Sequence, residues 1–190
     1  MRGFLFLCGL ALIIWVASAK HPVAMLRAPG YISDPSSYTA NVYKFAFDSS
    51  ADSFLRKETE EAIHDWENKA PGLTFQVLDS PCHEKNCIVI VSVTADSLSQ
   101  EHGAAPGTDR YIGWCEVTEL PIRIEIASDG LNQDYTIRHE LGHAIGLGHG
   151  DVDTVMSWHS TQGATKVTCA DVRAYFAMLH DRMPNCEETP

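Results

Sequence analysis

Three histidines and a glutamate lie close together in the segment HELGHAIGLGH, which runs from His139 to His149. His139 and His143 are four residues apart, so on a helix both side chains leave the same face and can bind one metal ion. Glu140 projects at a different angle and need not be a ligand. It can instead hold and deprotonate a metal-bound water. The spacing predicts a metal centre built for hydrolysis.

A third ligand cannot come from the same straight helix in tetrahedral geometry, so the chain must turn back. Gly146 stands where such a turn is needed, because glycine adopts left-handed backbone angles at little steric cost and is common just past helix ends. His149 then reaches the ion from the other side. Three histidines and one open position are typical of a catalytic zinc site, with Zn–N distances of roughly 2.0–2.1 Å. We therefore expect one catalytic Zn²⁺.

The segment resembles the signature of the metzincin zinc peptidases, H-E-x-x-H-x-x-G-x-x-H. That family also has a methionine turn beneath the metal, and Met156 in TVMSW is suitably placed after the third histidine. The helix core HELGH, with Gly142, most resembles the matrixin branch, the matrix-metalloproteinase-like catalytic domains. Trp158 stands where astacin-like and serralysin-like members carry a ligating tyrosine.

The chain departs from the matrixin pattern in three ways. Gly150 follows the third histidine, where matrixins usually have serine. The propeptide segment P-R-C-G-x-P-D is absent from the sequence. We also find no clear match to the loops that hold the structural zinc and calcium of matrixins, and although the acidic composition permits Ca²⁺, no EF-hand-like loop supports it.

The resemblance implies peptide hydrolysis, with Glu140 as the general base and Met156 packed beneath the zinc without binding it. The substrate would lie extended along an edge strand, where backbone pairing can hold any sequence. By analogy with the fold, that edge is YIGWC, although an ordinary internal strand is an equally good interpretation. Trp158 would help to form the pocket beyond the cut. The candidate substrate-binding residues are Tyr111, Ile112, Gly113, Trp114 and Trp158.

Hydrophobic patterning predicts an α/β (α+β) domain with a twisted mixed five-stranded sheet, a central zinc-binding helix and a C-terminal helix. The expected strands are 41–47, 73–78, 87–93, 110–117 and 122–127. The expected helices are 53–69, from 132–134 to Leu147, and one that begins with the capping pattern Thr168-x-x-Asp171 and stops before Pro184. Apolar stripes on these helices, which include Phe54, Leu55 and Trp66, are expected to be core.

The N-terminal sequence predicts export. Residues 1–19 combine a positive start, an apolar run and a small-residue cleavage site after Ala19, as in a signal peptide, although an uncleaved anchor is an alternative. We expect residues 20–40 to be an arm or short pro-segment, 41–186 the catalytic domain and 187–190 a tail. The arm is either a disordered leader or a blocking segment whose Asp34 or His21 reaches the zinc.

After signal cleavage the cysteines are Cys82, Cys87, Cys115, Cys169 and Cys186. An exported chain favours disulfides. Cys82 and Cys87 can close a short loop, the last two bracket the final helix, and Cys115 could pair with either group. Four other histidines lack ligand spacing and are expected at the surface: His64, His83, His102 and His180.

The net charge of −11, from 14 Lys and Arg against 25 Asp and Glu, argues against a nucleic-acid partner. We expect a secreted zinc endopeptidase that acts on peptides or proteins, has no membrane partner once the signal is cleaved, and is monomeric by default. Two alternatives remain: a narrow peptidase that processes one partner protein, and a zinc-bearing binding protein or toxin with little or no general proteolytic activity.

Overall fold

The computed structural model describes residues 42–80, 82, 86–103, 111–130, 132–157, 164–179 and 186. The expectations for the signal peptide, the arm, Trp158 and the C-terminal tail lie outside these residues. Within the described part, no helix is both long enough and apolar enough to span a membrane.

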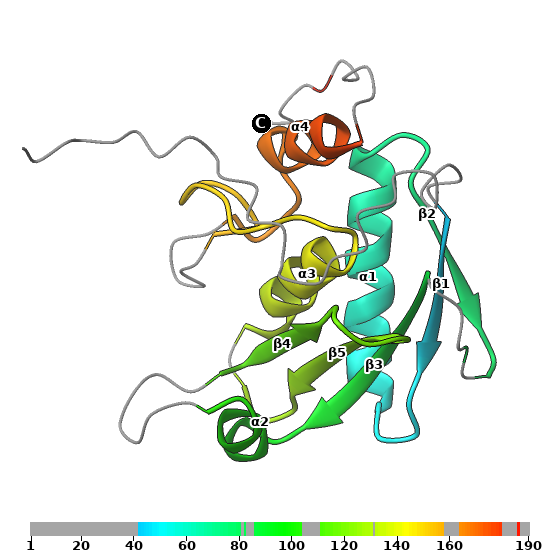
Figure 1. Ribbon diagram of the computed structural model, residues 1–190, viewed down its shortest axis with the longest axis vertical. Coiled ribbons are helices and arrows are strands. Elements are labelled where there is room, and N and C mark those ends of the chain that lie inside the picture. Colours follow the sequence, from blue (N-terminus) through cyan, green and yellow to red (C-terminus); the bar gives the residue numbers. More distant parts are fainter. Residues whose placement is uncertain are drawn as a thin grey trace, which may run out of the picture.

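A mixed five-stranded sheet forms the framework, as predicted (Figure 1). Its strands are β1 (Val42–Phe47), β2 (Thr74–Leu78), β3 (Cys87–Val93), β4 (Gly113–Glu116) and β5 (Ile122–Ala127). Their order is β2-β1-β3-β5-β4, and only β4 runs antiparallel to its neighbour. The fourth strand was expected over 110–117 and is shorter, so β4 is a brief strand at one end of the sheet.

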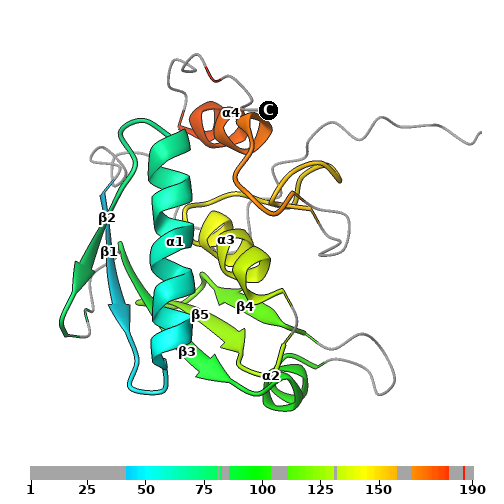
Figure 2. The same ribbon diagram turned by 180° about the vertical axis from the view of Figure 1, so that it is seen from behind.

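Helix α1 (Ser53–Lys69) lies beside α3 (Gln133–Ala144) on one face of the sheet (Figures 1 and 2). Helix α4 (Cys169–Met178) lies near the C-terminal end of α1 in both views. The predicted zinc helix is thus α3, in the middle of the domain. It was expected to run to Leu147 but ends at Ala144, because a glycine turn follows.

Burial fixes the position of α1. Asp52 caps its N-terminus by accepting a hydrogen bond from the Leu55 N–H at 2.8 Å. Leu55 and Trp66 are buried with the rest of the inward stripe, whereas Phe54 is 55% exposed and is not core, contrary to expectation. One turn of the helix brings residues three and four apart to the same face, and Phe54 falls off that face.

A short helix, α2 (Ala95–Glu101), was not predicted. It buries only Ala95 and Leu98, which is too little to give a helical period in the sequence. His102 caps its C-terminus. This histidine was expected at the surface, but its ring stacks on Trp114 at 4.1 Å and its Nε2 lies 3.0 Å from Glu125 Oε2. A buried carboxylate on β5 therefore holds α2 against the sheet.

Two disulfides join Cys82 to Cys87 and Cys169 to Cys186. Cys115 keeps a free thiol, so of the pairings that the sequence left open, the two that form are those within each group. Residue 115 lies on β4 and packs at the margin of the main core, away from both disulfides in the sequence.

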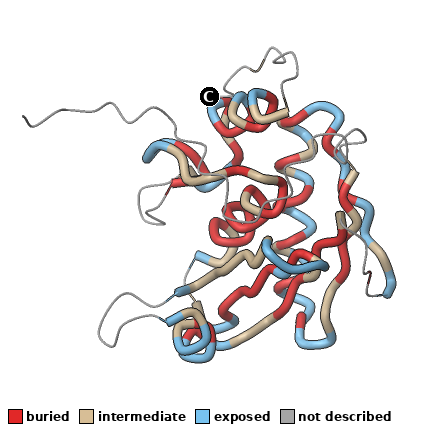
Figure 3. The backbone as a smooth tube through the Cα atoms, viewed as in Figure 1, coloured by how far each residue is buried: buried red, intermediate tan, exposed pale blue. Residues whose placement is uncertain are grey.

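A partly buried ion pair joins α1 to α3. Arg138 Nε lies 3.0 Å from Asp65 Oδ2, and the same oxygen accepts a hydrogen bond from the Val167 N–H at 3.0 Å. The Trp66 indole N–H donates to the Arg138 carbonyl at 3.0 Å. Figure 3 shows that α3 is buried along most of its length. The pair thus fixes α3 against α1 at the residue that precedes His139.

We expect Asp65→Ala to lower the free energy of unfolding by about 3 kcal/mol, because it removes the close partner of the buried Arg138 charge and leaves only Asp134 Oδ2, 4.0 Å away. Urea unfolding measures this. Glu61→Ala is the matched control, since Glu61 pairs with Lys57 in an exposed i,i+4 bridge, and such a bridge contributes little to stability. Equal effects of the two substitutions would contradict a bracing role for Asp65.

Candidate metal centre and active site

The three histidines predicted as ligands converge. The ring centroids of His139, His143 and His149 are 4.7–5.1 Å apart. One nitrogen from each ring lies within 4.8 Å of the others. His139 and His143 come from α3, and His149 comes from the loop beyond it. The arrangement offers three nitrogen ligands to a single ion.

The turn after α3 is the glycine turn expected from the sequence. Gly146 has φ of 104°, which a residue with a Cβ rarely adopts. The Leu147 N–H donates to the Gly142 carbonyl at 2.9 Å and the Gly146 N–H to the His143 carbonyl at 2.9 Å. These two bonds form a Schellman motif, which ends the helix and reverses the chain toward His149.

The same turn orients a ligand. The Leu147 carbonyl lies 2.8 Å from His143 Nδ1, and the Val155 carbonyl lies 2.8 Å from His139 Nδ1. A carbonyl only accepts, so each Nδ1 must carry the proton and each neutral ring must keep an unprotonated Nε2. Two backbone carbonyls thus select the tautomer that binds metal.

The resulting nitrogens require a cation between them. His139 Nε2 and His143 Nε2 lie 3.1 Å apart. With both Nδ1 atoms protonated, neither Nε2 of the neutral rings can donate a hydrogen bond to the other, and two lone pairs at this distance repel. Two nitrogens of a tetrahedral zinc site are roughly 3.3 Å apart. The donor set therefore fits a metal ion of this kind.

The rings are held in the neutral form that ligation needs. Burial, followed by the neighbouring His143, lowers the pKa of His139 to about 3. The same two causes, in the same order, lower the pKa of His149 to about 4. Burial also lowers the pKa of His143. Protons therefore compete little with a metal ion for these nitrogens near neutral pH.

Met156 lies directly beneath α3, as expected of a methionine turn. It is 2% exposed, and a Cβ added at Gly142 would overlap its sulfur and lie 3.0 Å from its methyl group. Gly142 therefore stands between the two histidines because the thioether occupies the space of a side chain.

Gly150, the residue that departs from the matrixin pattern, also lies where there is little space for a side chain. Its N–H donates to the Met156 carbonyl at 2.7 Å. A Cβ there would lie 2.7 Å from Thr154 Oγ1, which itself donates to the Asp151 carbonyl. The residue after the third histidine is thus tied to the methionine turn, with no room for a side chain.

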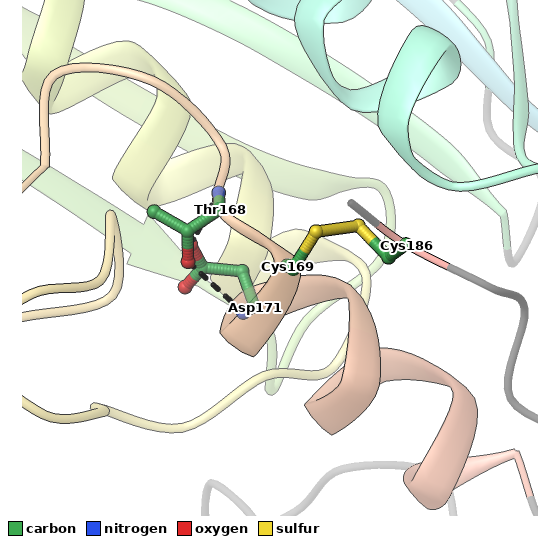
Figure 4. The surroundings of a disulfide bond; sticks show 4 residues. All are labelled: Thr168, Cys169, Asp171 and Cys186. Atoms are coloured by element: carbon green, nitrogen blue, oxygen red, sulfur yellow. Dashed lines mark hydrogen bonds between the residues drawn. A yellow bond between two sulfur atoms is a disulfide. The ribbon is translucent and has the colours of Figure 1, made fainter. Parts of the chain in front are cut away.

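Asp171 anchors that turn from α4. It is 1% exposed and accepts hydrogen bonds from the Val155 N–H at 3.1 Å and the Met156 N–H at 3.3 Å. It also forms a capping box with Thr168, beside the Cys169–Cys186 disulfide (Figure 4). Through Val155, whose carbonyl contacts His139, this carboxylate helps to orient a ligand.

A second anchor is Tyr135, one turn before His139 on α3. Its hydroxyl donates to the Ser157 carbonyl at 2.7 Å and lies 3.4 Å from His139 Nδ1. Burial raises the pKa of this tyrosine to about 12, so it stays a donor. The role of Tyr135, and that of Asp171 beyond its cap, could not be predicted from the sequence, because both depend on a turn distant in the sequence.

Glu140 is buried on α3 beside His139, 7% exposed, and faces β4. A Cβ added at Gly113 would lie 2.8 Å from Glu140 Oε1. Burial raises the pKa of this carboxyl to about 8 in the metal-free chain, which places a proton-accepting group within reach of neutral pH. The structure therefore brings the expected base next to the expected substrate strand.

The other predicted substrate residues lie at different places. Tyr111 and Ile112 precede β4, and Tyr111 is 37% exposed with its ring edge-on to Trp114. Trp114 lies on β4, but its side chain stacks on His102 and so faces away from Glu140. The structure does not bring the Trp114 ring to the site.

A second group of possible ligand atoms comes from Glu101, His102 and Glu125. Arg123 Nε lies 2.7 Å from Glu125 Oε1 and already supplies a positive charge there. We therefore assign no metal to this group. It is an ionic contact that fastens α2 to the sheet.

The sequence profile of the dual-action HEIGH metallo-peptidases matches residues 25–174, most of the chain. The chain belongs to this metallopeptidase family. In the one-letter code, HEIGH differs from residues 139–143 of this chain only by isoleucine in place of Leu141, which is buried. The matrixin branch inferred from the sequence stays a prediction.

No curated protein sequence matches the chain significantly. Among solved structures, the chain is similar to high choriolytic enzyme 1, a hatching-enzyme zinc protease from the medaka fish Oryzias latipes. The two are 13% identical, with a TM-score of 0.48, over 74% of this chain and 90% of the other.

In this HEIGH metallopeptidase we expect Gly142→Ala and Met156→Ala to be coupled. Met156→Ala alone leaves a cavity, and Gly142→Ala alone forces the sulfur to move. In the double variant the new methyl group occupies vacated space. Its loss of unfolding free energy should therefore be at least about 1 kcal/mol smaller than the sum of the two single effects. Urea unfolding of the four metal-free chains measures this, and strict additivity would contradict the contact.

Proposed function

We propose that this metallopeptidase is a zinc-dependent endopeptidase in which His139, His143 and His149 hold one zinc ion and Glu140 is the general base. The pair of unprotonated Nε2 atoms 3.1 Å apart, each with its Nδ1 against a backbone carbonyl, carries the proposal. Imidazole ligands suit zinc, and three of them leave one coordination position open for catalysis.

Zinc bound there would supply a Lewis acid that activates water and polarises a peptide carbonyl. The protein supplies proton transfer. The Glu140 carboxylate accepts a proton from the attacking water and then donates it to the amine that leaves when the peptide bond breaks. Burial supports this role, because it raises the pKa of the carboxyl and so makes it a stronger proton acceptor than an exposed glutamate.

Substrate binding along β4 is supported by its position at one end of the sheet. In the described part of the chain, no strand pairs with its other side. The Ala127 N–H donates to the Ile112 carbonyl at 2.9 Å, so Ile112 and Ala127 form a hydrogen-bonded pair of the antiparallel strands. The next pair, Gly113–Ile126, is therefore a non-hydrogen-bonded pair. In such a pair the amide groups of Gly113 point away from β5. They are directed to where an extended peptide would pair.

We further propose, from the sequence, that the protein is secreted after removal of residues 1–19, acts as a monomer and belongs to the matrixin branch. The small-residue cleavage site and the glycine in HELGH support the first and the last of these. The arm over residues 20–40 remains either a leader or a blocking segment.

The competing interpretation is a zinc-bearing binding protein or toxin with little proteolytic activity. Glu140 separates the two, because it is not needed to hold the ion. We expect Glu140→Ala to keep one bound zinc while peptide cleavage falls about a thousandfold. Cleavage of a mixed peptide library, read by mass spectrometry with and without a zinc chelator, measures the loss.

Glu60→Ala is the matched control, since Glu60 is an exposed glutamate on α1 away from the triad. It should leave both zinc content and cleavage unchanged. Wild-type cuts that persist in the chelator, or that survive Glu140→Ala, would contradict the proposed mechanism. Full zinc binding with no cuts in the wild-type protein would favour the binding-protein interpretation.

A further inference from the structure

Gly113, the first residue of β4, lacks a side chain where the strand meets α3. A Cβ built there would lie 2.8 Å from Glu140 Oε1 and 3.0 Å from Glu140 Cγ, and it would overlap the methyl group of Thr136. These separations are below ordinary van der Waals contact. Glu140, the base of the proposed reaction, therefore occupies the space that the Cβ of any other residue at position 113 would need.

The backbone conformation does not explain this glycine. Among the described residues, those with positive φ are Gly72, Gly103, Asn132 and Gly146, and Gly113 is not one of them. A glycine inside a strand weakens it and usually marks a close approach. Here the close approach is the Glu140 carboxylate.

The same residue turns its amide groups to the open side of β4. The pairing with β5 uses Ile112, and by alternation Trp114, and leaves Gly113 directed outward. Gly113 thus lies between Glu140 and the open side of the strand. Glu140 contacts Gly113 where a side chain would be, and the N–H and C=O of Gly113 point to where an extended peptide would pair.

We propose that Gly113 is a positioning residue: its missing side chain lets the Glu140 carboxylate lie against the residue that would hold the substrate backbone. This rests on the proposed function of Glu140 and β4. A methyl group at 113 would push the carboxylate away from the peptide aligned on the strand, and displacement of a reacting group by about 1 Å can cost on the order of a hundredfold in rate.

The test is Gly113→Ala in the zinc-loaded chain, with Thr136→Ser as the matched substitution. Thr136→Ser removes the methyl group that the new Cβ would overlap and keeps the hydroxyl that donates to the Asn132 carbonyl. We expect Thr136→Ser alone to be as active as wild type. Gly113→Ala, alone or with Thr136→Ser, should lower kcat about tenfold to a hundredfold with KM and zinc affinity little changed. If the single variant does not fold, Thr136→Ser and the double variant give the comparison.

A second readout needs neither zinc nor substrate. In the metal-free chain, Gly113→Ala should destabilise less in a Glu140→Ala background, because two of its three close contacts are then gone. Equal destabilisation in both backgrounds overturns the proposal. So does an unchanged kcat, or a kcat fully restored by Thr136→Ser, which would assign Gly113 to strand–helix packing alone.

Failure of the proposed function gives a different pattern. In that case Glu140→Ala cleaves peptides as well as wild type, whereas the stability coupling between Gly113 and Glu140 still appears if the carboxylate occupies the space beside β4.

Discussion

Two unprotonated imidazole nitrogens lie 3.1 Å apart in a partly buried site, and the contacts around them serve to hold that arrangement. Neutral rings with both lone pairs turned inward repel unless a cation lies between them. The fold must therefore hold His139 and His143 in one tautomer, keep their rings neutral, and bring His149 to the same point.

Two turns of the backbone and three further contacts meet that demand. The Schellman turn at Gly146 supplies the Leu147 carbonyl, and the methionine turn supplies the Val155 carbonyl. Asp171 from α4 and Tyr135 from α3 hold the methionine turn in place. Behind them, the ion pair between Asp65 and Arg138 fixes α3 against α1. The two carbonyls restrict one ring each through a hydrogen bond, and the other contacts hold the turn and the helix in place.

The sequence predicted what depends on local spacing. The i,i+4 histidines, the turning glycine and the strand segments along the chain follow from residue type and period, whereas Met156 was singled out by the family resemblance. It could not show α2, whose two buried residues make no pattern, nor the contacts of His102 with Glu125 and Trp114 across the sheet. From the sequence, Gly113 was predicted as a substrate-binding residue on a strand and Asp171 as part of a helix cap. Their closest partners, Glu140 and the Val155 amide, are distant in sequence, so only the folded chain reveals them.

Zinc X-ray absorption on the zinc-loaded chain shows whether the three histidines alone hold a single zinc ion. We expect one zinc per chain with three imidazole nitrogens at roughly 2.0–2.1 Å, one further light ligand, and loss of one imidazole in His149→Ala. A sulfur ligand, for which Cys115 carries the one free thiol of the described residues, would contradict this coordination. A coordination shell unchanged by His149→Ala would contradict it as well.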